Sequence, residues 1–325
     1  MLFYSTERFN NHYNCNSLTD KEWDSEGHPN ITLGIIYITS SIPFFIATIP
    51  CLMVMLKKEF RKNSVYQILF LQTLTDIIGI IISSYISGFY TIIGATFCKY
   101  RVFNYILGHI GGFNWSCAGM TTILLVFNRI VDLSNPFLAK SIFDGNKTLI
   151  WLVLPIIYGL LYSLFVPPVI FSSSIYTFAF NPFVGTSLDS KMSANYNYTS
   201  ILQPINNFFI SGIISFLYII LCALLIKKSN VATKSENMSK IQRNLIIQSI
   251  LICFPIHFNA VMYTFFQYIS INLDVIIFSH GCWIFTHSIP SVIYIVFNSS
   301  IRNCIANEYL GTYFQKNKTL SIQKI

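Results

Sequence analysis

Residues 204–226 read PINNFFISGIISFLYIILCALLI, a run of 23 residues without a charged side chain. A bilayer core is about 30 Å thick, and a helix needs roughly 20 apolar residues to cross it. Lys227 and Lys228 follow the run directly and mark its end. The stretch therefore predicts a helix that spans a membrane.

Six more apolar runs of similar length lie on either side of this one. They cover residues 33–56, 68–88, 103–127, 149–171, 245–268 and 275–297. Only 10% of the 325 residues are charged, whereas soluble domains carry about 25%, so a soluble fold is excluded. The predicted fold class is an all-α membrane protein, a seven-transmembrane helix bundle. It has a tail at 1–32, a helical domain at 33–300 and a second tail at 301–325.

The basic residues are sorted by loop, and this sorting predicts the orientation of the bundle. Sixteen of the 21 Lys and Arg residues follow the first, third, fifth or seventh run. Cytoplasmic loops carry the excess of Lys and Arg, so we expect an extracellular N-terminus and a cytoplasmic C-terminus. The net charge of +8 is thus explained by topology, and no nucleic-acid partner is expected.

Two glycosylation acceptors fall on the expected extracellular side. Asn30-Ile31-Thr32 lies in the N-terminal tail, and Asn197-Tyr198-Thr199 lies in the long loop 172–203. The pattern Asn-x-Ser/Thr marks surface loops of exported segments, but such triplets also arise by chance. Asn30 and Asn197 are therefore the candidate glycosylation sites.

Asp76 is the only acidic residue inside an apolar run. A carboxylate at mid-bilayer is disfavoured by roughly 2.5–3.5 kcal/mol on insertion scales, so it persists where it faces the bundle interior. The plain alternative is a water-exposed position near a span end. In the interior, Asp76 would hold a sodium ion, water or a proton and act as a polar hinge between two bundle states.

The sixth and seventh runs carry polar stripes at helical spacing. Pro255 is expected to kink the sixth, and Asn259, Tyr263 and Gln267 follow it on one face. In the seventh, His280, Trp283 and His287 share a face that continues to Pro290 and Tyr294. These stripes either line a ligand cavity or make ordinary interhelical hydrogen bonds. The candidate pocket residues are His109, Asn206, Asn207, Asn259, Tyr263, Gln267, His280, Trp283 and His287.

The chain gives little sign of metal or enzyme chemistry. Its eight cysteines include no C-x-x-C pair, and His280, Cys282 and His287 lack a zinc spacing, so no cofactor is expected. The third run presents Gly108, Gly111, Gly112 and Gly119, a pattern of small residues typical of a close helix-packing seam.

Asn128-Arg129-Ile130, at the inner end of the third run, is similar to the Asp-Arg-Tyr motif of rhodopsin-like G-protein-coupled receptors. The acid is replaced by Asn128, so the intrahelical salt bridge of that motif is absent. The plain alternative for Arg129 is a positive-inside anchor that extends to the lipid headgroups.

Further short motifs resemble the nematode chemoreceptors of serpentine receptor class T, in the same order nearly end to end. Among them are Tyr13-Asn14-Cys15, Pro50-Cys51-Leu52, Phe97-Cys98, Phe143-Asp144-Gly145, Phe180-Asn181-Pro182 and Ile289-Pro290. The resemblance implies a chemosensory receptor that couples to a heterotrimeric G protein in the plasma membrane of sensory neuron cilia. Its ligand, a small molecule or a peptide, would bind between the third, fifth, sixth and seventh helices.

The resemblance also implies a switch and a disulfide. The switch residues would be Asp76, Asn128, Arg129, Pro255, Pro290 and Tyr294. In rhodopsin-like receptors the cysteine before the third helix pairs with one in the second extracellular loop, but residues 172–203 contain none. The other cysteine expected outside is Cys15, so a Cys15–Cys98 disulfide would fold the tail over the bundle.

Two other functions, a transporter or channel and an intramembrane protease, require sequence features that differ from those of a receptor. A transporter or channel would carry several intramembrane charges or a repeat, whereas Asp76 stands alone. An intramembrane metalloprotease would need a His-Glu-x-x-His motif, which the sequence lacks. The expectation is a receptor, with membrane lipid around it and no enzymatic activity.

Overall fold

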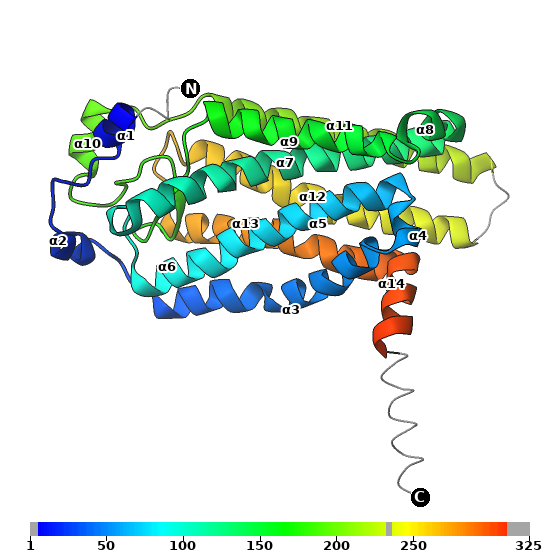
Figure 1. The fold of residues 1–325 in the computed structure, drawn as a ribbon, viewed down its shortest axis with the longest axis horizontal. Helices are drawn as coiled ribbons and strands as arrows, with labels where there is room; N and C mark the ends of the chain where they lie inside the picture. Colours follow the sequence, from blue (N-terminus) through cyan, green and yellow to red (C-terminus); the bar gives the residue numbers. More distant parts are fainter. Residues whose placement is uncertain (1–5, 232–235, 311–325) are drawn as a thin grey trace, which may run out of the picture.

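The computed structural model describes residues 6–231 and 236–310, and seven long helices run side by side through this part of the chain (Figure 1). The second of them is continuous across three segments. It begins as α5, widens into a π-helix at η1 and ends as α6. The bounds are α3 Ile31–Met55, α5 Ser64–Ile80, η1 Ile81–Ile86, α6 Ser87–Ile93, α7 Arg101–Ser134, α9 Lys147–Phe165, α11 Leu202–Val231, α12 Glu236–Phe265 and α13 Leu273–Phe297.

Within the described residues, six of these helices are long and apolar enough to cross a membrane, and α12 adds the shorter apolar segment Leu251–Phe265. The seven-helix bundle expected from the sequence is therefore confirmed. The bounds expected for the fourth span were wrong, because α9 ends at Phe165 and not at 171. Pro167 and Pro168 follow; proline has no N–H to donate and disfavours helix at the preceding residue.

The short elements gather at the two ends of the bundle (Figure 1). One end, here called the cap end, holds α1 Thr6–His12, α2 Asp20–Ser25, η2 Cys98–Tyr100, β1 Ile170–Ser172, β2 Thr177–Ala179 and α10 Asp189–Asn195. The other, here called the basic end, holds α4 Lys58–Arg61, α8 Pro136–Phe143, α14 Ser299–Ile305 and η3 Ala306–Leu310. Parts of the expected cytoplasmic segments lie outside the described residues, namely Lys234 and residues 311–325. The side chains of residues 228–250 are also outside the description.

The bundle is apolar outside and partly polar inside. Ile150 on α9 and Ile219 on α11 are among many large apolar side chains that are exposed along the helices. By contrast, Asn104 and Asn114 of α7 are buried, as are several histidine, serine and threonine side chains. This arrangement suits a lipid bilayer, because polar groups there obtain hydrogen-bond partners only in the protein interior.

A disulfide fastens the N-terminal segment to the cap end. The pairing of Cys15 with Cys98 expected from the sequence is present, with the two Cα atoms 5.5 Å apart. The Arg101 guanidinium lies 4.2 Å from the centroid of the Phe9 ring, and its Nη2 donates to the Phe9 carbonyl. The segment is thus held over the mouth of the bundle by covalent, cation–π and hydrogen-bond contacts.

A β-hairpin forms the roof of the bundle interior. Strands β1 and β2 pair antiparallel, with Phe171 opposite Phe178. Phe178 packs edge-on against Trp283 of α13, with ring centroids 5.5 Å apart, and Phe171 packs on Tyr90 of α6. Burial of these aromatic rings draws the hairpin down between the helices.

Two of the four glycines in the expected packing seam do permit a close approach. A Cβ on Gly108 would overlap the Val169 carbonyl, and one on Gly119 would meet the Ile210 side chain at 2.7 Å. Gly111 and Gly112 have more room. The seam is therefore real at Gly108 and Gly119, whereas Gly111 and Gly112 face a cavity.

Candidate functional site

A small cavity, here called the outer cavity, lies beneath the hairpin. Its volume is about 60 Å³. Five helices and the hairpin supply its walls, so it lies where a ligand would touch most of the bundle at once. The lining residues are Gly111, Gly112, Trp115, Tyr162, Val169, Phe178, Gln203, Asn207, Asn259, Tyr263 and Trp283.

Hydrogen bonds orient much of this lining. Asn207 Oδ1 accepts from Trp115 Nε1 at 3.0 Å, and Asn207 Nδ2 donates to the Ala260 carbonyl at 3.2 Å. The Tyr263 hydroxyl bonds Thr177 Oγ1 of the hairpin at 2.9 Å. These bonds join α7, α11, α12 and β2, so a change at the cavity reaches all four.

Four of the nine residues expected in the pocket line the outer cavity: Asn207, Asn259, Tyr263 and Trp283. Two others lie just behind it. Asn206 Oδ1 accepts from the Tyr158 hydroxyl at 2.7 Å, and Gln267 Nε2 donates to Gln203 Oε1 at 2.7 Å. These two support the lining and do not belong to it.

His280 and His109 do not line the outer cavity, and a role for them in ligand binding stays a prediction. His280 is fully buried and ties three elements together, because its Nδ1 bonds Thr177 Oγ1 at 2.9 Å and its Nε2 bonds the Ser83 carbonyl of η1 at 2.8 Å. His109 faces α9 instead, with Nδ1 3.0 Å from the Ser163 carbonyl.

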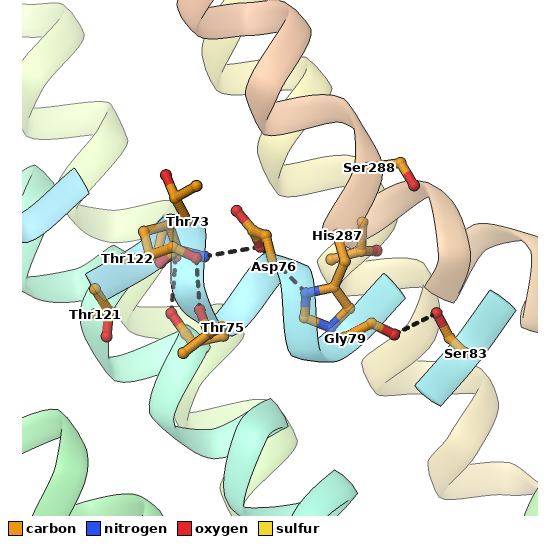
Figure 2. A network of polar contacts seen from close by, with 12 residues as sticks. Thr73, Thr75, Asp76, Gly79, Ser83, Thr121, Thr122, His287 and Ser288 are labelled. Atoms are coloured by element: carbon orange, nitrogen blue, oxygen red, sulfur yellow. Dashed lines mark hydrogen bonds and ion pairs between the residues drawn. The ribbon is translucent and has the colours of Figure 1, made fainter. Parts of the chain in front are cut away.

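The ninth candidate, His287, pairs with Asp76 deep in the bundle. His287 Nδ1 lies 3.2 Å from Asp76 Oδ1, and the two residues are 2% and 3% exposed. Figure 2 shows the imidazole turned toward the carboxyl group, with Gly79 beside it. A Cβ at Gly79 would overlap that ring, so the glycine creates the space that His287 occupies.

Polar neighbours complete this pair. Gln72 Nε2 donates to Asp76 Oδ1 at 3.2 Å, and Gln72 Oε1 accepts from the Thr122 hydroxyl at 3.3 Å. The network therefore joins α5, α7 and α13 (Figure 2). Asp76 Oδ2 and His287 Nε2 have no hydrogen-bond partner among the described residues.

A second space, here called the middle cavity, adjoins the Asp76–His287 pair. It also measures about 60 Å³ and is lined by Asp76, His287, Pro290 and Tyr294 together with residues of α7, α11 and α12. Trp115 lines both the outer and the middle cavity. Its ring packs edge-on toward His287, with centroids 6.5 Å apart, so Trp115 forms the partition between the two.

A third space, here called the basic-end cavity, opens among α5, α7, α11, α12 and α13. Its volume is about 450 Å³, and Arg129 and Asp132 are charged residues of its wall. This cavity and the middle cavity share four lining residues: Leu125, Tyr218, Ile252 and Tyr294. Arg129 is exposed there.

The remaining expected switch residues occupy distinct positions. Asn128 is buried and donates from Nδ2 to Ser64 Oγ at 3.1 Å. It therefore ties α7 to α5 beside Arg129. Pro255 lies inside α12, where its missing N–H removes one helical hydrogen bond; the kink expected there stays a prediction.

The two candidate glycosylation sites differ in their surroundings. Asn197 is exposed in the loop after α10, and its Oδ1 accepts from the backbone N–H and the hydroxyl of Thr199. Asn30 is half-buried and caps α3, because its Oδ1 accepts from Leu33 N at 3.0 Å. Both lie at the cap end.

Sequence reasoning missed several residues of these sites. Trp115 is not among the nine pocket candidates, yet it separates two cavities. Thr177, Phe178 and Gln203 carry no pattern that marks them, since their partners lie far away in sequence. Gln72 was within reach of sequence reasoning, because it lies four residues before Asp76 and so shares its helix face.

Comparison with known proteins matches this architecture to one family. The model of the serpentine type 7TM GPCR chemoreceptor family Srt matches residues 1–318. Serpentine receptor class T-55 of Caenorhabditis elegans is 25% identical over 304 residues, which cover 93% of this chain and 81% of that protein. The seven-helix bundle described above agrees with the match, and the chain belongs to the serpentine 7TM GPCR chemoreceptor family, class T.

Proposed function

We propose that this chemoreceptor binds a small molecule in the outer cavity and passes the signal to a heterotrimeric G protein at the basic end. In this proposal the cap end faces outward from the plasma membrane, as the sorting of Lys and Arg predicts. The family resemblance favours the cilia of sensory neurons as the site of action.

The observation that carries the proposal is the row of three cavities with shared walls. Trp115 belongs to the first two, and Tyr294 belongs to the last two. A ligand acts only through its different affinities for two states of the bundle. A ligand that moves Trp115 changes the space beside His287, and a repacked middle cavity moves Tyr294 at the wall of the basic-end cavity.

The basic end offers the surface that such a partner needs. Arg129 and Asp132 line the 450 Å³ cavity, and Arg129 also lines the neighbouring groove beside α8. On α8 the Phe137 side chain is 83% exposed. A cavity with charged residues in its wall, at the same end of the bundle as an exposed aromatic ring, suits the docking of a peptide-like segment of a protein partner.

The experiment that tests the proposal is energy transfer between the tagged receptor and a panel of Gα subunits, for wild type and for Arg129→Ala. We expect a signal that GTP abolishes and that Arg129→Ala reduces at unchanged surface expression. Lys58→Ala, at an exposed position of α4 that lines neither the basic-end cavity nor the groove beside α8, is the matched control for loss of one positive charge. Equal signals from wild type and Arg129→Ala, at equal surface levels, would contradict a role for Arg129.

A further inference from the structure

Two residues that line the outer cavity each carry a buried polar atom with no partner among the described residues: Asn259 Oδ1 and Trp283 Nε1. Asn259 is 1% exposed and Trp283 is 7% exposed, and both residues line the cavity. An unsatisfied group in such a place is disfavoured by about 1–3 kcal/mol. Each therefore points to a ligand group that would satisfy it.

Neighbouring bonds fix which atom of the Asn259 amide is left over. The Thr286 hydroxyl donates its single proton to the Cys282 carbonyl at 2.8 Å. It can then only accept from Asn259, at 3.1 Å, so the amide nitrogen of Asn259 faces Thr286. The oxygen of Asn259 is the free acceptor, and the indole N–H of Trp283 is a donor by its chemistry.

The rest of the lining restricts the charge of the ligand. None of the described residues that line the outer cavity is acidic, basic or histidine. The other polar side chains of the lining include Asn207, Tyr263 and Gln203, which already bond to Trp115, Thr177 and Gln267. Burial of an unpaired ion in such surroundings is strongly unfavourable, whereas an uncharged molecule loses little.

We propose that the outer cavity takes an uncharged, mostly apolar small molecule with a hydrogen-bond donor for Asn259 Oδ1 and an acceptor for Trp283 Nε1. A primary carboxamide or an alcohol meets both needs with one group, because Asn259 of α12 and Trp283 of α13 line the same cavity. This inference rests on the proposed role of the outer cavity as the ligand site. Buried groups left unpaired reject analogues that lack the matching atom.

The test is a binding screen on the full-length receptor in lipid nanodiscs. Three fragment sets of equal number and size are compared: primary amides and alcohols, protonated amines, and carboxylates, each with a short alkyl chain of two or three carbons that suits the small cavity. Binding is read from the thermal midpoint and from tryptophan fluorescence, since Trp115 and Trp283 line the cavity. We expect the binders to come from the uncharged set.

The roles of the two polar atoms are tested with receptor variants and with an altered ligand. Asn259→Leu and Trp283→Phe should each weaken the best amide by about tenfold, as expected for one buried hydrogen bond. The controls are Asn114→Leu, which changes a buried asparagine outside the lining, and Trp151→Phe, whose indole nitrogen donates to the Ile142 carbonyl. On unaltered receptor, the N,N-dimethyl amide should show a loss similar to that of Asn259→Leu, so the result does not depend on the folding of a variant.

The outcomes separate the two proposals. Binding of amines or carboxylates in preference to the uncharged set, or binding of no fragment, overturns the ligand class. Equal affinity for the amide and its dimethyl form also overturns it. Binding as expected, with no effect of the ligand on Gα energy transfer, supports the ligand class and contradicts the proposed signalling function.

Discussion

The outer cavity and the basic-end cavity lie in the same bundle and differ in nearly every property. The first measures about 60 Å³ and its described lining is uncharged; the second measures about 450 Å³ and includes Arg129 and Asp132. Phe178 of the β-hairpin forms part of the wall of the first, whereas residues of helices supply most of the wall of the second. Small size and an uncharged lining that includes two residues with an unpaired polar atom suit selection of a small molecule. A larger space with charged residues in its wall suits a protein partner.

The two regions are also held in different ways. At the cap end, a disulfide, a hairpin and the His280 bridge join segments that lie far apart in the sequence. Between the two ends lies the Asp76–His287 pair, the buried polar contact that joins α5 to α13. One helix bundle thus contains an outer end that is cross-linked between distant segments and an inner end with a larger cavity, with the polar centre between them.

The largest expected effect on stability comes from removing the disulfide at the cap end. Cys15→Ser opens a disulfide between residues 83 apart in sequence, and loop-closure entropy predicts a loss of about 4 kcal/mol. We expect a lower thermal midpoint and faster hydrogen exchange over residues 6–30. Cys222→Ser, which changes a free cysteine of α11, serves as control. Equal stability of the two variants would show that the cap end is held by its other contacts.

The next effect lies at the polar centre. Asp76→Ala leaves His287 buried without its partner, and breaking a buried pair in this way lowers stability by about 3 kcal/mol or more. Asp76→Asn keeps an acceptor oxygen for Gln72 and His287, so its loss should be less than half as large. Thermal unfolding in nanodiscs measures both. If alanine and asparagine destabilise equally, the negative charge and not the hydrogen bond holds the centre.

A third prediction tests the same centre without removing a polar atom. Gly79→Ala places a methyl group on the His287 ring, and overpacking of this kind lowers stability by about 1–3 kcal/mol. Gly281→Ala is the matched control on α13, because nothing lies within 4 Å of its added Cβ. Alanine is the better helix former there by up to about 1 kcal/mol. The two thermal midpoints should therefore move in opposite directions.

A fourth change should affect coupling with little effect on folding. Phe137→Ala removes an 83% exposed ring from α8, so the thermal midpoint should shift by an amount equivalent to less than about 0.5 kcal/mol. The Gα energy-transfer signal should fall several-fold if this ring inserts into the partner. Leu149→Ala, an exposed apolar change at the start of α9, tests whether any such loss is specific.

The smallest expected effect decides which end faces outward. Asn197→Gln should shift the apparent mass of the receptor by one glycan, because Asn197 is exposed. Asn30→Gln should shift it less or not at all, since Asn30 caps α3 and is half-buried. Gel mobility after endoglycosidase treatment measures both. Glycans added to acceptors engineered into α8, and none at Asn197, would reverse the proposed orientation.

Much of the site followed from short-range patterns. Asn259 and Tyr263 were identified because they lie four residues apart on one helix face, and Trp283 and His287 for the same reason. The helical spacing of these residues does not distinguish a side chain that lines a cavity from one that hydrogen-bonds to another helix. His280 was therefore grouped with Trp283, although His280 hydrogen-bonds to Thr177 and Ser83. Which side of a stripe meets a cavity depends on how the neighbouring helices are rotated.

The sequence by itself determined the helices, because a membrane span requires an apolar length that can be counted along the chain. It also determined that Asp76 is buried, since a carboxylate within an apolar span is stable only where it contacts polar groups in the bundle interior. Only the tertiary structure shows that the partner of Asp76 is His287, 211 residues away. It also shows that Trp115 lies between two cavities. Such contacts depend on packing across helices, which local periodicity does not encode.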